Sequence, residues 1–283
     1  SASHIVYSGF GAVTGTGGDV TGVTGNFDLG TQVSSASGLD YSGFNVATVA
    51  GSGSGATLIG AGQTYTLDNA VADKGSNGSI AWTGFGNIQD NIGTVAFGTG
   101  GSLSGSVTAQ TLDYSSYGSA VNFDLSAGTG TTTGIGGSWS GVTSVTGSAQ
   151  GDTLAGTGQT YTLTSANAGN NGTVSWTAFE NIADATGTVA FAAGGSLSGN
   201  ATVQALDYGS YGSAVNFDLS DGSGATTGIG GTWSGVTAVT GSSVGDTIAG
   251  NNQTYTLTGA NAGNNGTVSW TSFENIADSG TGT

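Results

Sequence analysis

The side chains of this chain that could carry chemistry are almost all carboxylates. The sequence holds 17 Asp and Glu residues against one basic residue, Lys74, and one His, His4. Acid–base and triad catalysis most often use His, and His4 stands alone near the first residue. A glycosidase needs only two carboxylates about 5–10 Å apart. Asp218 and Asp221 could form such a pair, but the residue that matches Asp221 in a sister repeat is Ala127. We therefore expect no catalytic residues and no enzymatic activity.

Two short blocks recur with an acidic residue inside them. They are Leu112-Asp-Tyr-Ser115 with Leu206-Asp-Tyr-Gly209, and Phe179-Glu-Asn-Ile182 with Phe273-Glu-Asn-Ile276. Four carboxylates in these blocks could act as acids or metal ligands: Asp113, Asp207, Glu180 and Glu274. The most divergent copy reads Phe85-Gly-Asn-Ile88, so it keeps the apolar positions and lacks the Glu. We expect buried Leu/Tyr and Phe/Ile pairs, with the acidic residue facing outward at a turn.

The strongest candidate metal ligands are Asp152 and Asp246. They lie in Gly151-Asp-Thr-Leu-Ala-Gly156 and Gly245-Asp-Thr-Ile-Ala-Gly250. These segments resemble the tail of the nonapeptide G-G-x-G-x-D-x-U-x, which binds Ca²⁺ between turns of an RTX β-roll. The upstream Gly-Gly pair is missing, and the motif occurs only once per repeat. The alternative interpretation is a turn Asp that caps nearby backbone. We expect no required cofactor, with Ca²⁺ at Asp152 and Asp246 as the one candidate.

Internal repetition dominates the sequence. Residues 93–186 and 187–280 align without a gap at an offset of 94, and 21 of the 94 positions differ. Residues 1–92 form a divergent first repeat, in which Gln63-Thr-Tyr-Thr-Leu67 matches Gln159–Leu163. Residues 281–283 begin a further, truncated repeat. Because the sequence contains no Met and no signal peptide, we expect the chain to be part of a longer protein.

The composition favours an all-β chain. Gly occupies 57 positions, while Pro, Cys and Met are absent. The hydrophobic fraction of 36%, with 10 Phe, 9 Tyr and 5 Trp, is enough to bury a thin core, so global disorder is not expected. Strong helix formers other than Ala are scarce, and each interior Gly costs a helix about 1 kcal/mol. Thr, Val and the aromatic residues fit a pleated, half-buried surface instead.

Short segments alternate apolar and polar residues with a period of two. In 120–125, Val121, Phe123 and Leu125 share one face, and in 160–164 the apolar face is Tyr161 and Leu163. In 173–179 the apolar face consists of Val174, Trp176 and Ala178. Phe179 then breaks the alternation and indicates a corner before Ile182. Asn-Gly pairs at 171–172 and 265–266 are good hairpin signals.

This spacing predicts an elongated parallel β-solenoid, of the β-helix or β-roll kind, built from the 94-residue repeats. Rungs of roughly 20 to 25 residues would place about four rungs in each repeat. A series of small β-sandwich modules, one per repeat, is the alternative. Solenoid arrays need atypical end repeats for solubility, so we expect either that the natural chain continues or that its ends associate end to end with a neighbouring subunit.

The charge balance excludes several partners. The net charge is −16 with a single Lys. Nucleic acids and anionic membrane surfaces are bound mainly through Lys and Arg, so neither is an expected partner. No run of about 18 apolar residues is present, so no membrane span is expected.

The recurring blocks resemble those of giant bacterial surface and secreted β-strand-repeat proteins, the adhesins of the filamentous-haemagglutinin and RTX-related kind. The resemblance rests on Leu-Asp-Tyr-Ser, Val-x-Phe-Asp-Leu, Gly-Asp-Thr-Leu-x-Gly and Phe-Glu-Asn-Ile, and it extends over essentially the whole chain. It implies secretion to the cell surface and an adhesive or structural role, as a stalk or as a filament or sheath subunit, with surface glycans as candidate ligands. A Ca²⁺-dependent RTX-like binding module is the alternative function, and a carbohydrate-active β-helix enzyme is a third.

Overall fold

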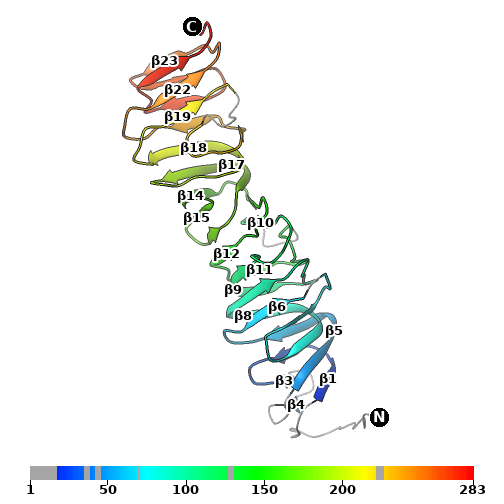
Figure 1. Ribbon diagram of the computed structural model, residues 1–283. Coiled ribbons are helices and arrows are strands. Elements are labelled where there is room, and N and C mark those ends of the chain that lie inside the picture. The colour runs from blue at the N-terminus through cyan, green and yellow to red at the C-terminus, as the bar shows by residue number, and fades with distance from the viewer. Residues whose placement is uncertain (1–17, 35–38, 42–45, 69, 127–130, 221–225) are drawn as a thin grey trace. The chain divides into compact units, whose positions relative to one another are not determined.

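The computed structural model describes residues 18–34, 39–41, 46–68, 70–126, 131–220 and 226–283 (Figure 1). These residues form β-strands and turns and contain no helix. The chain divides into two compact units. Unit 1 comprises Ser1–Gly118 with Gly128–Val142, and unit 2 comprises Ser119–Ala127 with Thr143–Thr283.

The strands of unit 1 are β1 (Gly18–Val23), β2 (Asn26–Asp28), β3 (Val33–Ser34), β4 (Leu39–Asp40), β5 (Val46–Ile59), β6 (Thr64–Leu67), β7 (Lys74–Ser76), β8 (Ala81–Phe97), β9 (Val107–Asp113) and β11 (Trp139–Ser140). The strands of unit 2 are β10 (Asn122–Asp124), β12 (Ser144–Thr146), β13 (Thr153–Ala155), β14 (Thr160–Ser165), β15 (Ala168–Asn170), β16 (Ser175–Thr177), β17 (Asn181–Ala192), β18 (Ala201–Ser210), β19 (Asn216–Asp218), β20 (Trp233–Ser234), β21 (Ala238–Thr240), β22 (Thr247–Gly250), β23 (Thr256–Gly259), β24 (Ala262–Asn264), β25 (Ser269–Thr271) and β26 (Asn275–Asp278).

Strands one turn apart pair in parallel, which makes each unit a β-solenoid. In unit 1, β5 pairs with β8 and β8 with β9. In unit 2, β10 pairs with β13 and β13 with β17, while β17 pairs with β18 and β18 with β21. Figure 1 shows β17 and β18 lying one above the other. The all-β parallel solenoid predicted from the sequence is confirmed, and the sandwich alternative, which requires antiparallel sheets, does not describe the molecule.

The predicted rung length was wrong. Val121 bonds to Asp152 31 residues later, and Asp152 bonds to Glu180 a further 28 residues on. The steps from Asn181 to Asn200 and from Asn87 to Ser106 are short, at 19 residues each. The long steps contain an extra excursion, either a hairpin or a Gly/Thr-rich loop, so a rung is longer than its short strands alone require.

Apolar side chains form columns through the stacked turns. Because paired residues of neighbouring parallel strands point to the same side, each turn adds one member to a column. One column of unit 2 consists of buried residues that pair in sequence: Tyr161, Val189, Leu206, Val239 and Trp270. A second column consists of Phe123, Leu154, Ile182 and Ala201.

The alternating segments bury the residues that the sequence predicted, with one exception. Val121, Phe123 and Leu125 are buried, as are Tyr161, Leu163, Val174 and Trp176. Ala178 was expected on the same face as Trp176 but is only half-buried. Its φ of 57° lies in the left-handed region, so the corner before β17 begins at Ala178, one residue before Phe179.

A small antiparallel insertion interrupts the parallel stacking in each repeat. β14 pairs antiparallel with β15, and β15 pairs antiparallel with β16 across the Asn171-Gly172 turn. Gly172 has a φ of 88°, which an Asn-Gly hairpin turn favours. The same arrangement joins β23, β24 and β25 around Asn265-Gly266. Both hairpins predicted from Asn-Gly are confirmed. Within the described residues, no helix long and apolar enough to span a bilayer occurs.

Candidate functional site

Asp152 lies fully buried, at 0% exposure, between two turns of unit 2. Its Oδ1 accepts hydrogen bonds from the backbone N–H of Val121 (2.7 Å) and from Ser148 Oγ (2.8 Å). Its Oδ2 accepts a short hydrogen bond from the backbone N–H of Ser148. Gly147 is required beside it, because an added Cβ would lie 2.5 Å from Asp152 Oδ2. The carboxylate therefore joins one turn to the loop of the next.

Asp246 repeats this arrangement in the next repeat. Its Oδ1 accepts from the backbone N–H of Val215 (2.7 Å) and from Ser242 Oγ (2.9 Å), and its Oδ2 accepts a short bond from the Ser242 N–H. Like Asp152 it has no exposed surface. The N–H and O–H donors of the chain itself occupy both oxygens of each buried carboxylate. The geometry thus supplies the capping role that was the alternative to calcium.

Glu180 and Glu274 are hydrogen-bonded to the same turn. Glu180 Oε2 accepts from the backbone N–H of Asp152 (2.9 Å), and Oε1 accepts from Asn167 Nδ2 (3.1 Å). Glu274 accepts the corresponding bond from Asp246 N–H (2.8 Å). Since Glu180 contacts residues 28 and 13 positions away, it ties three segments of the chain together. This contact explains why a Glu follows Phe179 in the repeats that also carry the Asp.

A melting experiment tests whether Ca²⁺ binds at Asp152 and Asp246. Ca²⁺ takes six to eight oxygen ligands, and binding would have to displace the N–H and O–H donors already at the two carboxylates. We expect these donors to keep Ca²⁺ from binding. Because a ligand stabilises only the state that binds it, the melting temperature should be the same in Ca²⁺ and in EGTA, to within about 1 °C. Circular dichroism melting measures this. A rise in Ca²⁺ that disappears in Asp152→Asn would establish the metal site instead.

Three further carboxylates were not singled out in the sequence: Asp90 and Asp184, which are buried, and Asp278, which is half-buried. Asp184 Oδ1 accepts from Gly158 N–H (2.9 Å), and its Oδ2 accepts from Gln159 N–H (2.8 Å) and from the Tyr161 hydroxyl (3.2 Å). Asp90 makes the same three contacts with Gly62, Gln63 and Tyr65, and Asp278 makes them with Asn252, Gln253 and Tyr255. The sequence did contain a signal for these three Asp residues, because an Asp recurs at this position in all three repeats at the 94-residue offset. Asp152, in contrast, has no counterpart in the first repeat.

The hydrogen bonds at Asp184 shift its acidity. Burial is the largest single influence on Asp184 and opposes its ionisation. The N–H groups of Gln159, Gly158 and Thr186, with the Thr186 hydroxyl, together outweigh it and lower the pKa of Asp184 below 3.8. Burial, followed by the charge of Asp184, raises the pKa of Tyr161 far above its usual value. Tyr161 therefore remains a protonated donor, and Asp184 an ionised acceptor, throughout the neutral range.

Acid should destabilise the fold through Asp184. A carboxyl whose pKa is lower in the folded state contributes stability above its unfolded pKa, and this contribution is lost as the pH falls through the folded pKa. We expect the free energy of unfolding to fall as the pH drops below about 4. In Asp184→Asn this pH dependence should be weaker. Tyr161→Phe is the matched control, since it keeps the carboxylate and its N–H donors. Guanidinium titrations at successive pH values measure the slope, and an unchanged slope in Asp184→Asn would refute the assignment.

The acidic residues of the Leu-Asp-Tyr blocks were expected at turns, but the structure places them on strands: Asp113 is the last residue of β9, and Asp207 lies within β18. Leu112 and Tyr114 are buried, while Asp113 Oδ1 accepts from the N–H of Ser115 (2.9 Å). Asp207 accepts the corresponding bond from Gly209 (2.8 Å). The buried tyrosines also serve the fold. Tyr114 stacks on Phe97 at 4.1 Å and donates to Thr133 O (2.8 Å), and Tyr208 stacks on Phe191 at 4.4 Å and donates to Thr227 O (2.7 Å).

Of the candidate glycosidase pair Asp218 and Asp221, the structure describes Asp218. Asp218 Oδ1 accepts from the N–H of Ser220 (2.8 Å), two residues along, which makes it a turn residue. Asp221 and His4 lie outside the described residues.

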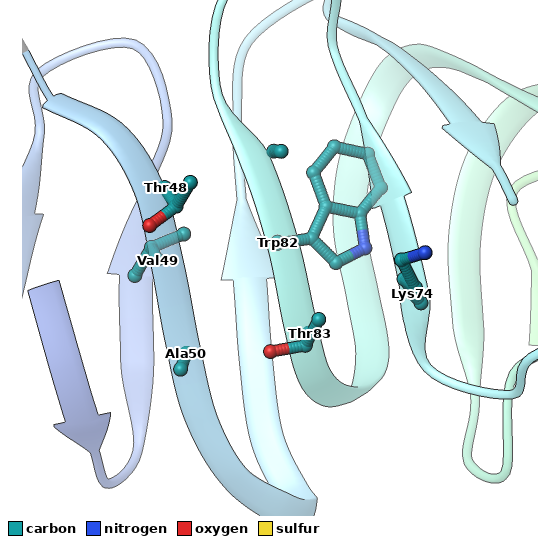
Figure 2. Close-up of a pocket in the computed structure, with 7 residues that line it drawn as sticks. Thr48, Val49, Ala50, Lys74, Trp82 and Thr83 are labelled. Atoms are coloured by element: carbon teal, nitrogen blue, oxygen red, sulfur yellow. The ribbon is translucent and has the colours of Figure 1, made fainter. Parts of the chain in front are cut away.

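The pocket in Figure 2 belongs to unit 1 and lies between β5, β7 and β8. It is lined by Thr48, Val49, Ala50, Lys74, Ala81, Trp82 and Thr83. Lys74 Nζ forms an ion pair with Asp68 Oδ2 at 2.7 Å, with both side chains partly exposed. The buried Nε1 of Trp82 has no hydrogen-bond partner, but the same holds for Trp176, where Ala168 replaces Lys74. The unpartnered indole is therefore a feature of repeat packing and does not mark a ligand site at Lys74.

The described residues bring no group of three or more His, Cys, Asp or Glu side chains together. Most of their carboxylates for which hydrogen bonds are described accept them from backbone N–H groups, as at Asp90, Asp152, Asp184 and Asp246. No protein-family model, curated protein or solved structure matches the chain.

Proposed function

We propose that the chain is an extracellular structural or adhesive repeat segment of a bacterial surface protein, and that it carries out no catalysis. It acts as a stalk or as a filament or sheath subunit that stacks end to end. The resemblance of its recurring blocks to surface and secreted β-strand-repeat proteins supports the location and the class.

The observation that carries this proposal is the use of the buried and half-buried carboxylates. Asp152 and Asp246, like Asp90, Asp184 and Asp278, accept hydrogen bonds from backbone N–H groups of a neighbouring turn. The groups most able to perform chemistry are thus engaged in holding turns together. Catalytic carboxylates need a free oxygen directed at a substrate. A repeat whose recurring acids serve its own stacking fits a mechanical role.

Outward-facing residues support the same interpretation. Ser and Thr hydroxyls form hydrogen-bonded pairs between neighbouring turns, as in Thr108 with Ser140 (3.0 Å) and Thr202 with Ser234 (3.0 Å). These pairs keep the lateral surface polar while they link turns. Polar lateral surfaces with short strands limit side-by-side aggregation and leave the strand edges at the ends of the array for association.

Electron microscopy of the native material tests the proposal. Immunogold labelling of intact producing cells, with antibodies raised against the purified chain, should place it outside the cell. Negative staining of the isolated material separates the two roles, because discrete rods indicate a stalk and continuous fibres indicate a polymer. Label confined to the cell interior would overturn the proposal. Release of oligosaccharides from a panel of acidic and neutral polysaccharides would also overturn it.

A further inference from the structure

All three repeats place an Asn-Gly pair at the tip of the same hairpin, between β7 and β8 in unit 1 and between β15 and β16 or β24 and β25 in unit 2. The pairs are Asn77-Gly78, Asn171-Gly172 and Asn265-Gly266. Each Gly is exposed, and a Cβ built on it would meet no atom within 4 Å. Since Gly has no side chain to shield its own nitrogen, solvent has access to the backbone at all three tips.

An Asn that precedes Gly can lose its side-chain amide with no reagent other than water. The Gly nitrogen attacks Cγ of the Asn, so that a bond forms between these two atoms and negative charge develops on Oδ1. The bond between Cγ and Nδ2 then breaks. The proton lost by the Gly nitrogen passes through water to Nδ2, which leaves as ammonia, and a cyclic imide remains. Water opens the imide to aspartate or isoaspartate, and nothing is oxidised or reduced.

Asn77 is held in a geometry that favours this attack. Its Oδ1 accepts hydrogen bonds from the backbone N–H groups of Ser79 (3.1 Å) and Ile80 (2.8 Å). Donors directed at an oxygen on which charge develops lower the barrier to attack on the adjoining carbon. Its Nδ2 donates to Gln63 Oε1 (3.1 Å). The matching Asn residues of the later repeats make the same three bonds at 2.8–3.1 Å, so these contacts do not distinguish the three tips.

The three tips differ in what holds the attacking nitrogen. Gly172 N–H donates to Asn170 Oδ1 (3.1 Å), and the third repeat contains the same bond at the same distance. In the first repeat Ser76 replaces Asn170. Among the described residues, the side-chain hydrogen bonds at this tip are those of Asn77, and no side chain accepts from the Gly78 N–H. The nucleophile is therefore held in the two later repeats and open in the first.

We propose that Asn77 is a site of spontaneous deamidation. The matching sites of the later repeats are protected, Asn171 by Asn170 and Asn265 by Asn264. The protecting bond has to break before the Gly nitrogen attacks, and one net hydrogen bond corresponds to a rate difference of roughly threefold to tenfold. Deamidation of Asn77 adds a negative charge to the tip and removes its Nδ2 donor, and isoaspartate also lengthens the backbone of the hairpin. Unit 1 therefore changes with age at this hairpin, whereas unit 2 keeps both of its own.

The wild-type chain supplies its own comparison. The folded protein is incubated in mildly alkaline buffer and digested with chymotrypsin at successive times. Mass spectrometry then measures deamidation at each site, with aspartyl and isoaspartyl peptides separated by chromatography. We expect Asn77 to deamidate about threefold to tenfold faster than Asn171 and Asn265. An intact Asn77, or equal rates at the three sites, would overturn the proposal.

Incubation in guanidinium separates the effect of the fold from that of the local sequence. Ser79 follows the first Asn-Gly pair, whereas Thr173 follows the second. Because unfolding removes the bond from Gly172 to Asn170, the difference in rate should disappear in the denatured chain. A difference that persists in guanidinium would belong to the local sequence and would refute the protecting role of Asn170.

Two exchanges between the repeats locate the effect. Ser76→Asn gives the first tip the acceptor of the later repeats and should slow deamidation of Asn77 to the rate of Asn171. Asn170→Ser removes that acceptor and should raise the rate at Asn171 to that of Asn77, while Asn265 stays slow as the internal control. Each variant introduces a residue that the chain already carries at the equivalent position. An unchanged rate at Asn171 in Asn170→Ser would contradict the assignment.

Hydrogen exchange shows whether the hairpin stays folded in Asn170→Ser. Asn171 N–H donates to Val174 O across the tip (3.2 Å), and this amide should exchange as slowly as in the wild-type chain. If exchange and deamidation at Asn171 both become faster, the variant opens the whole hairpin, and the role of the single bond from Gly172 is refuted.

Discussion

Replacing Asp152 by Ala should lower the free energy of unfolding by about 3 kcal/mol, since each buried donor left without a partner costs about 1–3 kcal/mol. The substitution removes the acceptor for the N–H groups of Val121 and Ser148. It also removes the acceptor of the Ser148 hydroxyl and leaves a void at a site with no solvent exposure. Hydrogen bonds to a charged acceptor are stronger than those between neutral groups. The expected loss is therefore among the largest for a single substitution at a buried position.

Guanidinium denaturation followed by Trp fluorescence measures this loss. Asp113→Ala is the control in unit 1, because Asp113 accepts one exposed hydrogen bond, from the N–H of Ser115. We expect that variant to lose less than about 1 kcal/mol. Asp246→Ala should behave like Asp152→Ala, since its three bonds are the same. Similar small losses for Asp152→Ala and Asp113→Ala would show that the buried carboxylate contributes no more than Asp113 does.

The fold class and the buried faces of short strands follow from the sequence for a clear reason. A strand buried on one face must alternate, so the position of Phe123 between Asn122 and Asp124 predicts its burial without any knowledge of its neighbours. Asn171-Gly172 likewise predicts its hairpin from local backbone preference alone. These features depend on residues close together in the chain.

The length of a turn could not be predicted in the same way. Parallel stacking fixes which residues pair, but the excursions between strands carry no periodic pattern. The long connection between β19 and β20 and the β14–β16 insertion lengthen their turns, whereas β17 and β18 are joined by a short connection. Strand spacing alone therefore gave rungs that were too short.

The carboxylate sites show the same limit. Asp152 drew notice through a motif, and Asp184 did not, although Asp184 accepts bonds from Gly158 and Gln159, 26 and 25 residues earlier. Only the register of neighbouring turns brings these groups together. The sequence showed that Asp90, Asp184 and Asp278 recur, but recurrence cannot distinguish a carboxylate that links turns from one such as Asp113, which accepts a bond from a residue two positions along.

Trp176→Ala should lower the free energy of unfolding by about 4 kcal/mol, the usual range for deleting a fully buried Trp. Trp176 is 2% exposed and forms the apolar centre of the β14–β16 insertion. Its ring packs edge-on against Tyr161 at 5.9 Å, and Gly169 lies so close that an added Cβ would come within 3.0 Å of Trp176 Cζ2. Val145 pairs with it from the preceding turn. Removing the indole leaves a cavity that these neighbours cannot fill without moving the backbone.

Trp176→Phe separates the loss of volume from the loss of polar contacts. Because the buried Nε1 of Trp176 has no hydrogen-bond partner, Phe gives up no hydrogen bond and should cost only about 1–2 kcal/mol. Far-UV circular dichroism during guanidinium denaturation measures both variants, since Trp fluorescence itself changes. Hydrogen exchange at the Asn171 amide, which donates to Val174 O across the hairpin, should accelerate in Trp176→Ala and stay slow in Trp176→Phe. Equal losses for the two variants would mean that the indole N–H is stabilised by a partner, and that the insertion is held by more than apolar packing.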